Sequence, residues 1–132
     1  NNSSYLGICV GMQILSDWGY EDKTTRGLGI ISGDIKKFRN KKLIIPHMGW
    51  NELKVAASHP VLDGVQTGDH VYFVHSYHFE VAESAALLAS VDYGGDQTAI
   101  VGRDNMIGTQ FHPEKSQATG LRIIENFLNW RP

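Results

Sequence analysis

The single cysteine of the chain, Cys9, lies midway between Gly7 and Gly11 in the sequence GICVG. A short apolar run precedes it, and apolar residues at helical spacing follow it. A nucleophile at a sharp turn between a strand and a helix needs small residues two positions before and after it. Such a turn favours the thiolate at the helix N-terminus and directs the Val10 N–H towards an oxyanion. The spacing alone leaves two interpretations open, a reactive nucleophile and an inert, packed thiol.

A base that could serve this nucleophile is found near the other end of the chain. His112 follows the apolar segment 106–111, and Pro113 and Glu114 come directly after it. Proline restricts the intervening backbone, so an imidazole and a carboxylate can take a defined geometry at the end of a strand. A lone His-x-Glu is typical of a surface pair. Together with Cys9, it becomes a candidate Cys/His/Glu triad.

Two motifs resemble those of the class I (triad) glutamine amidotransferases: GICVGMQ at 7–13 and GTQFHPEKS at 108–116. These enzymes hydrolyse glutamine to glutamate and deliver ammonia to a synthase. PHMGWN at 46–51 and YFVHSY at 72–77 resemble the glutaminase subunits of imidazole glycerol phosphate synthases more than their anthranilate, carbamoyl or pyridoxal relatives. The resemblance covers essentially the whole chain. It implies one amidotransferase domain over 1–132, an α/β, flavodoxin-like fold with an open mixed sheet and flanking helices.

The resemblance also implies a role for each matching residue. Cys9 would be the nucleophile, His112 the base and acid, and Glu114 the group that orients His112, with the Val10 N–H as oxyanion donor. The residues that would bind glutamine are Gln13, Glu21, Ser76 and Tyr77. The residues that would face a cyclase subunit, an obligate partner through whose barrel ammonia passes, are Trp50, Asn51 and Lys115. No cofactor and no metal ion is implied.

The family has further strands and helices before the cysteine strand, including a glycine-bearing loop that supplies a second oxyanion donor. Only four residues precede the apolar segment in this chain. We therefore expect an N-terminally truncated portion of the domain with half of an oxyanion hole. The loss of one donor typically lowers the rate by ~10²–10³-fold.

Hydrophobic periodicity predicts the elements that position these residues. A strand is expected over 5–9, followed by a helix that ends at Gly19. A C-terminal helix is expected to begin after Ser116 as its cap and to end before Pro132. The other expected strands are 28–35, 43–45, 71–81, 86–91, 98–101 and 106–111, the last three close enough in sequence to pair antiparallel.

Composition excludes several classes of function. Twelve basic and fourteen acidic residues give a formal net charge of −2, without a long run of one sign, so no nucleic-acid or anionic-membrane surface is predicted. No apolar run approaches the ~18 residues of a membrane span, and no signal peptide is recognisable. The lone cysteine agrees with a reducing compartment, which indicates a cytoplasmic protein.

Two other sites are considered and disfavoured. Gly27 and Gly29 begin a glycine pattern, but the third glycine of a dinucleotide fingerprint would fall on Ser32. His75 and His78 could ligate a metal ion, but residues three apart on an extended strand point to opposite faces. His47 and His59 lie next to or near prolines and are interpreted as ordinary solvated histidines.

Three classes of function remain. The first is a glutaminase bound to a cyclase, which supplies ammonia for histidine biosynthesis; a paralogous glutaminase could instead serve amidation of a surface-polysaccharide sugar. The second is a stand-alone cysteine hydrolase of γ-glutamyl or peptide bonds, which Gln13 and the HMGWN stretch disfavour. The third is a non-catalytic interaction module, disfavoured because it would not require an intact triad.

Overall fold

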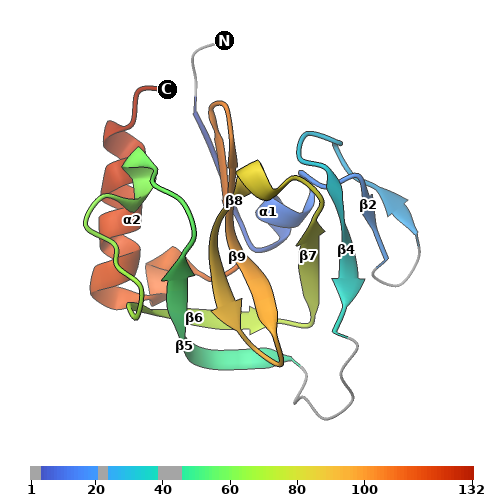
Figure 1. The fold of residues 1–132 in the computed structure, drawn as a ribbon, viewed down its shortest axis with the longest axis horizontal. Helices are drawn as coiled ribbons and strands as arrows, with labels where there is room; N and C mark the ends of the chain where they lie inside the picture. The colour runs from blue at the N-terminus through green and yellow to red at the C-terminus, as the bar shows by residue number, and fades with distance from the viewer. Residues whose placement is uncertain (1–3, 21–23, 39–45) are drawn as a thin grey trace.

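The computed structural model describes residues 4–20, 24–38 and 46–132. In these ranges the strands form two sheets (Figure 1). The six-stranded sheet has the order β1 (Tyr5–Ile8), β10 (Met106–Thr109), β9 (Asp96–Arg103), β8 (Leu87–Asp92), β5 (His47–Val55) and β6 (His70–His75). The four-stranded sheet has the order β3 (Thr25–Arg26), β2 (Trp18–Gly19), β4 (Gly33–Lys37) and β7 (Tyr77–Val81).

The pairing of β1 with β10 determines which residues meet at the edge of the larger sheet. These two strands are parallel, and Ile8 is in register with Thr109. The other pairs of the six-stranded sheet are antiparallel, which confirms the pairing expected for the last three strands. Because parallel strands end at the same edge, Cys9 and the segment 110–112 leave the sheet side by side.

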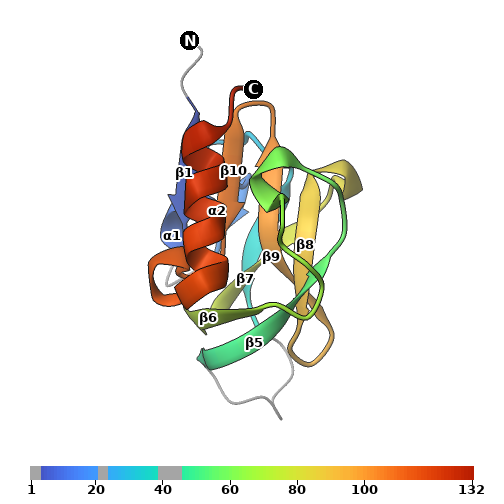
Figure 2. The ribbon, with the colours of Figure 1, turned by 90° about the vertical axis from the view of Figure 1, so that its left-hand side faces the viewer.

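Two α-helices occur in the described residues, α1 (Val10–Gln13) and α2 (Gln117–Asn129), with the 3₁₀ turns η1 (Pro60–Leu62), η2 (Ser84–Ala86) and η3 (Pro113–Lys115). Figure 2 shows α2 lying along β1 and β10. Ile123 of α2 joins a core cluster with Phe73, Ile107 and Phe111. A second cluster lies between the two sheets and includes Met12, Ile35, Phe79 and Val101. None of the helices in the described ranges is long and apolar enough to cross a membrane.

The helix after Cys9 is shorter than expected, because α1 ends at Gln13 rather than near Gly19. The carbonyls of Ile14 and Leu15 accept hydrogen bonds from a loop and not from amides further along a helix. The Leu28 N–H donates to the Ile14 carbonyl at 2.8 Å, and the amides of residues 30 and 31 both donate to the Leu15 carbonyl at 3.0 Å. Periodicity could not predict these tertiary bonds.

Two expected strands also differ. The segment 71–81 is not one strand: it is interrupted at Ser76, and β6 and β7 belong to different sheets. The segment 28–35 becomes extended only from Gly33, and 43–45 lies outside the described residues. Ser116 occupies the N-cap position of α2, but its side chain makes no capping hydrogen bond there.

Candidate active site

Cys9 lies at a strained turn between β1 and α1. Its backbone has φ 55° and ψ −105°, a conformation that residues other than glycine rarely adopt. The turn is held to the neighbouring strand because the Cys9 N–H donates to the Thr109 carbonyl at 2.7 Å. A Cβ atom on Gly7 would collide with the Gly11 carbonyl, so strand and helix do pass closely at Gly7. The geometry is that of a nucleophile turn.

Gly11 does not have the steric role that the spacing suggests. A Cβ atom added there would meet only the Tyr5 hydroxyl, at an ordinary contact distance of 3.5 Å. The expectation that both flanking positions must be small is therefore wrong for Gly11. The second close approach is made by Gly108 on β10, where a Cβ atom would lie 2.5 Å from Cγ of Met12.

Val10 presents a backbone donor beside the thiol. It begins α1 and is 62% exposed. The amides of Met12 and Gln13 both donate to the Cys9 carbonyl, at 3.0 and 3.1 Å. The Val10 N–H has no acceptor within the part of the chain that the structure describes. It is therefore available to an oxyanion formed at Cys9.

His112 and Glu114 form a pair at the end of the neighbouring strand. His112 Nδ1 lies 3.4 Å from Glu114 Oε2, with the imidazole 22% and the carboxylate 53% exposed. An imidazole whose Nδ1 faces a carboxylate has Nε2 free for proton transfer. Buried Pro113 separates the two residues at the start of η3.

The backbone of His112 is held on both sides. Its N–H donates to the Tyr72 carbonyl of β6 at 3.1 Å. The Ser116 hydroxyl donates to the His112 carbonyl at 2.7 Å and accepts from the Tyr72 N–H at 2.9 Å. These bonds explain why the Ser116 side chain does not cap α2. They also join the His112 turn directly to β6.

Gln13 and Tyr77, both expected to bind substrate, are brought together. Gln13 Nε2 lies 3.4 Å from the Tyr77 carbonyl oxygen and 3.1 Å from Gln110 Oε1. Ser76, at the interruption between β6 and β7, accepts the Phe38 N–H at 3.4 Å through its carbonyl. Glu21, the remaining residue expected to bind substrate, lies outside the described residues.

Two buried histidines, His47 and His75, are linked to the Tyr77 carbonyl. His47 Nδ1 is 3.0 Å from His75 Nε2, and His75 Nδ1 is 2.8 Å from the Tyr77 carbonyl oxygen. A carbonyl only accepts, so His75 donates from Nδ1 and His47 donates to His75. Burial lowers the pKa of each histidine to about 4, although in His75 the Tyr77 carbonyl opposes the effect. Both are therefore neutral near pH 7.

The histidines correct two interpretations made from the sequence. His47 is a buried strand residue stacked between Phe73 and Tyr93, not a solvated histidine. His75 and His78 do not point to opposite faces, since both rings contact Phe38. The interruption at Ser76 removes the regular alternation on which that interpretation depended.

The residues expected to face a partner differ in exposure. Trp50 is 48% exposed on β5, edge-on to Tyr72 of β6, and Lys115 is exposed on η3. The Asn51 amide instead makes internal bonds: Nδ2 lies 3.0 Å from the Asp92 carbonyl oxygen and 3.4 Å from His47 Nε2.

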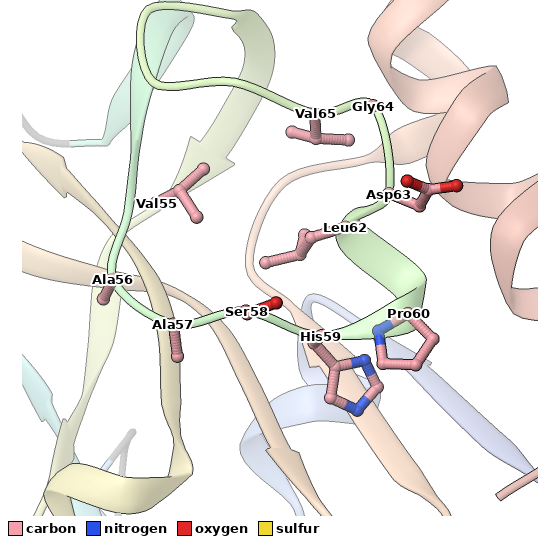
Figure 3. Close-up of a pocket in the computed structure, with 10 residues that line it drawn as sticks. All are labelled: Val55, Ala56, Ala57, Ser58, His59, Pro60, Leu62, Asp63, Gly64 and Val65. Carbon is pink, nitrogen blue, oxygen red and sulfur yellow. The ribbon is translucent and has the colours of Figure 1, made fainter.

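A groove of about 830 Å³ lies elsewhere, along the loop from the end of β5 to η1 (Figure 3). Its lining includes Val55, His59, Leu62 and Val65. The His59 ring accepts the Val61 N–H, and burial lowers its pKa. Of the residues expected at the active site, none that the structure describes lines this groove.

Sequence reasoning assigned no role to Gln110, although the residue is part of the quoted GTQFHPEKS motif. Its Nε2 lies 3.4 Å from Cys9 Sγ, and the residue is fully buried. A polar side chain directly after an apolar strand, two positions before the candidate base His112, is the signal that could have identified it.

Comparisons with known proteins show which family the chain belongs to. The family model described as "Glutamine amidotransferase class-I" matches residues 1–130. Proteins named "Imidazole glycerol phosphate synthase subunit HisH" from Cereibacter sphaeroides and Ruegeria pomeroyi are 59% and 58% identical over 130 residues, which is 97% of this chain and 61% of each relative. The protein of the same name from Brucella abortus is 55% identical over 133 residues, 97% of this chain and 62% of that protein.

Solved structures share the fold. The structure of a putative GMP synthase subunit from Thermoplasma acidophilum superposes with a TM-score of 0.71 at 22% identity, covering 98% of this chain and 57% of that one. A glutamine amidotransferase from Thermotoga maritima gives 0.64 at 18% identity, covering 96% and 47%. The chain spans about three fifths of the length of the curated relatives it matches. From the family match and these identities, we conclude that the chain belongs to the class-I glutamine amidotransferase family.

Proposed function

We propose that this chain forms part of the glutaminase subunit of an imidazole glycerol phosphate synthase. In this role it hydrolyses glutamine and passes ammonia to a cyclase subunit in histidine biosynthesis. The observation that carries the proposal is the placement of Cys9 at a strained turn beside the strand end from which His112 and Glu114 follow. The names of relatives 55–59% identical support the choice of pathway.

The proposed reaction begins with attack of the Cys9 sulfur on the side-chain carboxamide carbon of glutamine. His112 accepts the thiol proton, and the Val10 N–H stabilises the oxyanion of the tetrahedral intermediate. Collapse of this intermediate breaks the C–N bond, and His112 protonates the departing nitrogen to give ammonia and a thioester. Glu114 keeps the imidazole oriented and stabilises its charged form.

Water completes the proposed cycle. His112 takes a proton from a water molecule, whose oxygen adds to the thioester carbonyl. The second tetrahedral intermediate collapses with loss of the Cys9 thiolate, and glutamate is released. Gln13 and the backbone near Tyr77 would hold the amino-acid end of the substrate. Ammonia that travels directly to the cyclase escapes protonation in bulk water.

The test uses the chain extended at its N-terminus to the length of the curated relatives. Glutamate release is measured with and without a cyclase subunit that carries its ribonucleotide substrate. We expect strong stimulation by the loaded cyclase. Turnover that is indifferent to the cyclase would keep the glutaminase chemistry but assign it to another acceptor, such as a polysaccharide sugar. No turnover in either condition would contradict the proposal.

The Cys9→Ala variant identifies the nucleophile in the same assay. Because alanine cannot form the thioester, we expect glutamate release to fall by at least about 10³-fold. Binding of the cyclase, measured by titration calorimetry, should be unchanged, since Cys9 is only partly exposed and lies in the turn. Substantial residual turnover would exclude Cys9 as the nucleophile.

A further inference from the structure

We propose that Gln110 is a catalytic residue that donates a hydrogen bond to the Cys9 sulfur and holds it as a thiolate in position for attack. The inference takes the Cys9 nucleophile of the proposed function as its starting point. It concerns the step before the chemistry, in which the nucleophile has to be both deprotonated and correctly aimed.

The burial of Gln110 is the first reason for this role. The residue is fully buried, and its backbone N–H is fixed to the Ala99 carbonyl at 2.8 Å. A buried amide is unfavourable unless both of its ends are hydrogen-bonded. The carbonyl end accepts from Gln13 Nε2 at 3.1 Å, and the nitrogen lies 3.4 Å from Cys9 Sγ. The Cys9 sulfur thus accepts the hydrogen bond of the Gln110 side-chain nitrogen.

The orientation of the amide follows from its neighbours. The Tyr77 carbonyl can only accept, so the atom of Gln13 that lies 3.4 Å from it is the NH₂ group. The same NH₂ group lies 3.1 Å from the Gln110 side chain and requires an oxygen there. The NH₂ group of Gln110 therefore faces Cys9. Reversing either amide would place two acceptors or two donors against each other.

An N–H donor that faces sulfur distinguishes between the two protonation states. A thiolate is a charged acceptor, whereas a neutral thiol is a weak one, so the contact stabilises the thiolate. When the thioester forms, the sulfur loses its charge and the contact weakens. In the second half of the reaction the C–S bond breaks and its electron pair returns to sulfur, and the Gln110 N–H donates a hydrogen bond to the thiolate that forms. The same donor thus serves the nucleophile and the leaving group.

The test measures the protonation of Cys9 independently of turnover. The N-terminally extended chain, in complex with the cyclase subunit, is alkylated with iodoacetamide across a pH series, and modification of the Cys9 peptide is followed by mass spectrometry. In Gln110→Met, which keeps the volume but removes the donor, we expect the midpoint of the rate against pH to rise by about one pH unit. We expect kcat for glutamine at neutral pH to fall about tenfold.

Gln97→Met is the matched control. Gln97, on β9, donates from Nε2 to the Tyr93 carbonyl at 3.4 Å, without a recorded contact to Cys9. In Gln97→Met, the pH midpoint of Cys9 alkylation should equal that of the unmodified chain. An unchanged midpoint in a folded Gln110→Met variant would overturn the proposal.

A second variant applies if Gln110→Met does not fold, as judged by circular dichroism. Gln13→Met removes the group that orients the Gln110 amide and keeps a good helix-forming residue in α1. We expect a smaller upward shift of the midpoint, and no shift would overturn the proposal. If Gln110→Met shifts the midpoint while the unmodified complex releases no glutamate, the thiolate contact stands and the proposed function fails.

Discussion

At the scale of single residues, the two glycines that flank Cys9 look equivalent in the sequence but meet different surroundings. A side chain at Gly7 would collide with backbone atoms in the first turn of α1. The collision could be removed only by moving the strand or the helix. At Gly11 the nearest atom is the terminal hydroxyl of Tyr5, at an ordinary distance. The reactive turn therefore depends on one glycine of the pair for its close packing.

This difference predicts that only one of two alanine substitutions is destabilising. Gly7→Ala should destabilise the extended chain by about 1–3 kcal/mol, because the added methyl group overpacks the turn. Gly11→Ala should be neutral or stabilising by up to about 1 kcal/mol, since alanine is favoured over glycine inside a helix. Urea unfolding of both variants measures the difference. Equal destabilisation by the two substitutions would contradict this account.

At the scale of elements, β5 and β6 carry a hydrogen-bonded chain through the interior. His47 and His75 are direct cross-strand partners, which places their rings in contact. The bonds run from Asn51 through His47 and His75 to the Tyr77 carbonyl, which also accepts from Gln13. The strands that carry Trp50 and Tyr72 thus also fix the carbonyl that accepts from Gln13, the residue proposed to bind glutamine.

The buried histidine pair predicts how stability depends on pH. Each histidine has a pKa near 6.5 when unfolded and about 4 when folded, so the unfolded state binds more protons between these values. The stabilising effect of the neutral pair is complete above about pH 6.5 and decreases as the pH falls towards 4. The slope from each histidine is at most about 1.4 kcal/mol per pH unit.

Urea unfolding of the extended chain between pH 7 and pH 4 tests this prediction. His47→Gln keeps a donor towards His75 but does not titrate, so it should reduce the slope by up to half. His70→Gln is the control, because His70 is exposed on β6 and paired with Glu52. Parallel curves for the unmodified chain and His47→Gln would exclude the pair as the source of the pH dependence.

At the scale of the whole molecule, the sequence predicts the turn at Cys9 and the His112–Glu114 pair better than it predicts the segments around them. Cys9, His112 and Glu114 follow from short motifs whose chemistry depends on local spacing, and the strands β1, β8, β9 and β10 follow from apolar patterns. The interruption at Ser76 and the early end of α1 arise from bonds to distant segments. The contacts of Gln110 and His47 could not be predicted because their partners, Cys9 and His75, lie far away in the sequence.

A last prediction concerns the exposed face formed by β5 and β6, where we propose that the cyclase subunit binds. Met48 and Trp50, two positions apart on β5, both have exposed side chains. Trp50 contacts Tyr72, and the backbone of Tyr72 is hydrogen-bonded to His112 and to the Ser116 hydroxyl. A partner that contacts Trp50 on this face would be separated from His112, the proposed base, by a single intervening residue, Tyr72. Exposed tryptophans are common binding hot spots, whose removal costs about 2 kcal/mol or more.

Trp50→Ala should therefore weaken cyclase binding by about 30-fold or more in titration calorimetry, and reduce the stimulation of glutamate release accordingly. Leu128→Ala is the matched control, since Leu128 is more exposed than Trp50 but lies near the C-terminal end of α2. Lys115→Ala, which changes the residue next to Glu114 on η3, should lower the stimulation of glutamate release more than the affinity for the cyclase. If Trp50→Ala binds as tightly as Leu128→Ala, the cyclase does not bind on the β5–β6 face, and the short connection from Tyr72 to His112 has only a structural role.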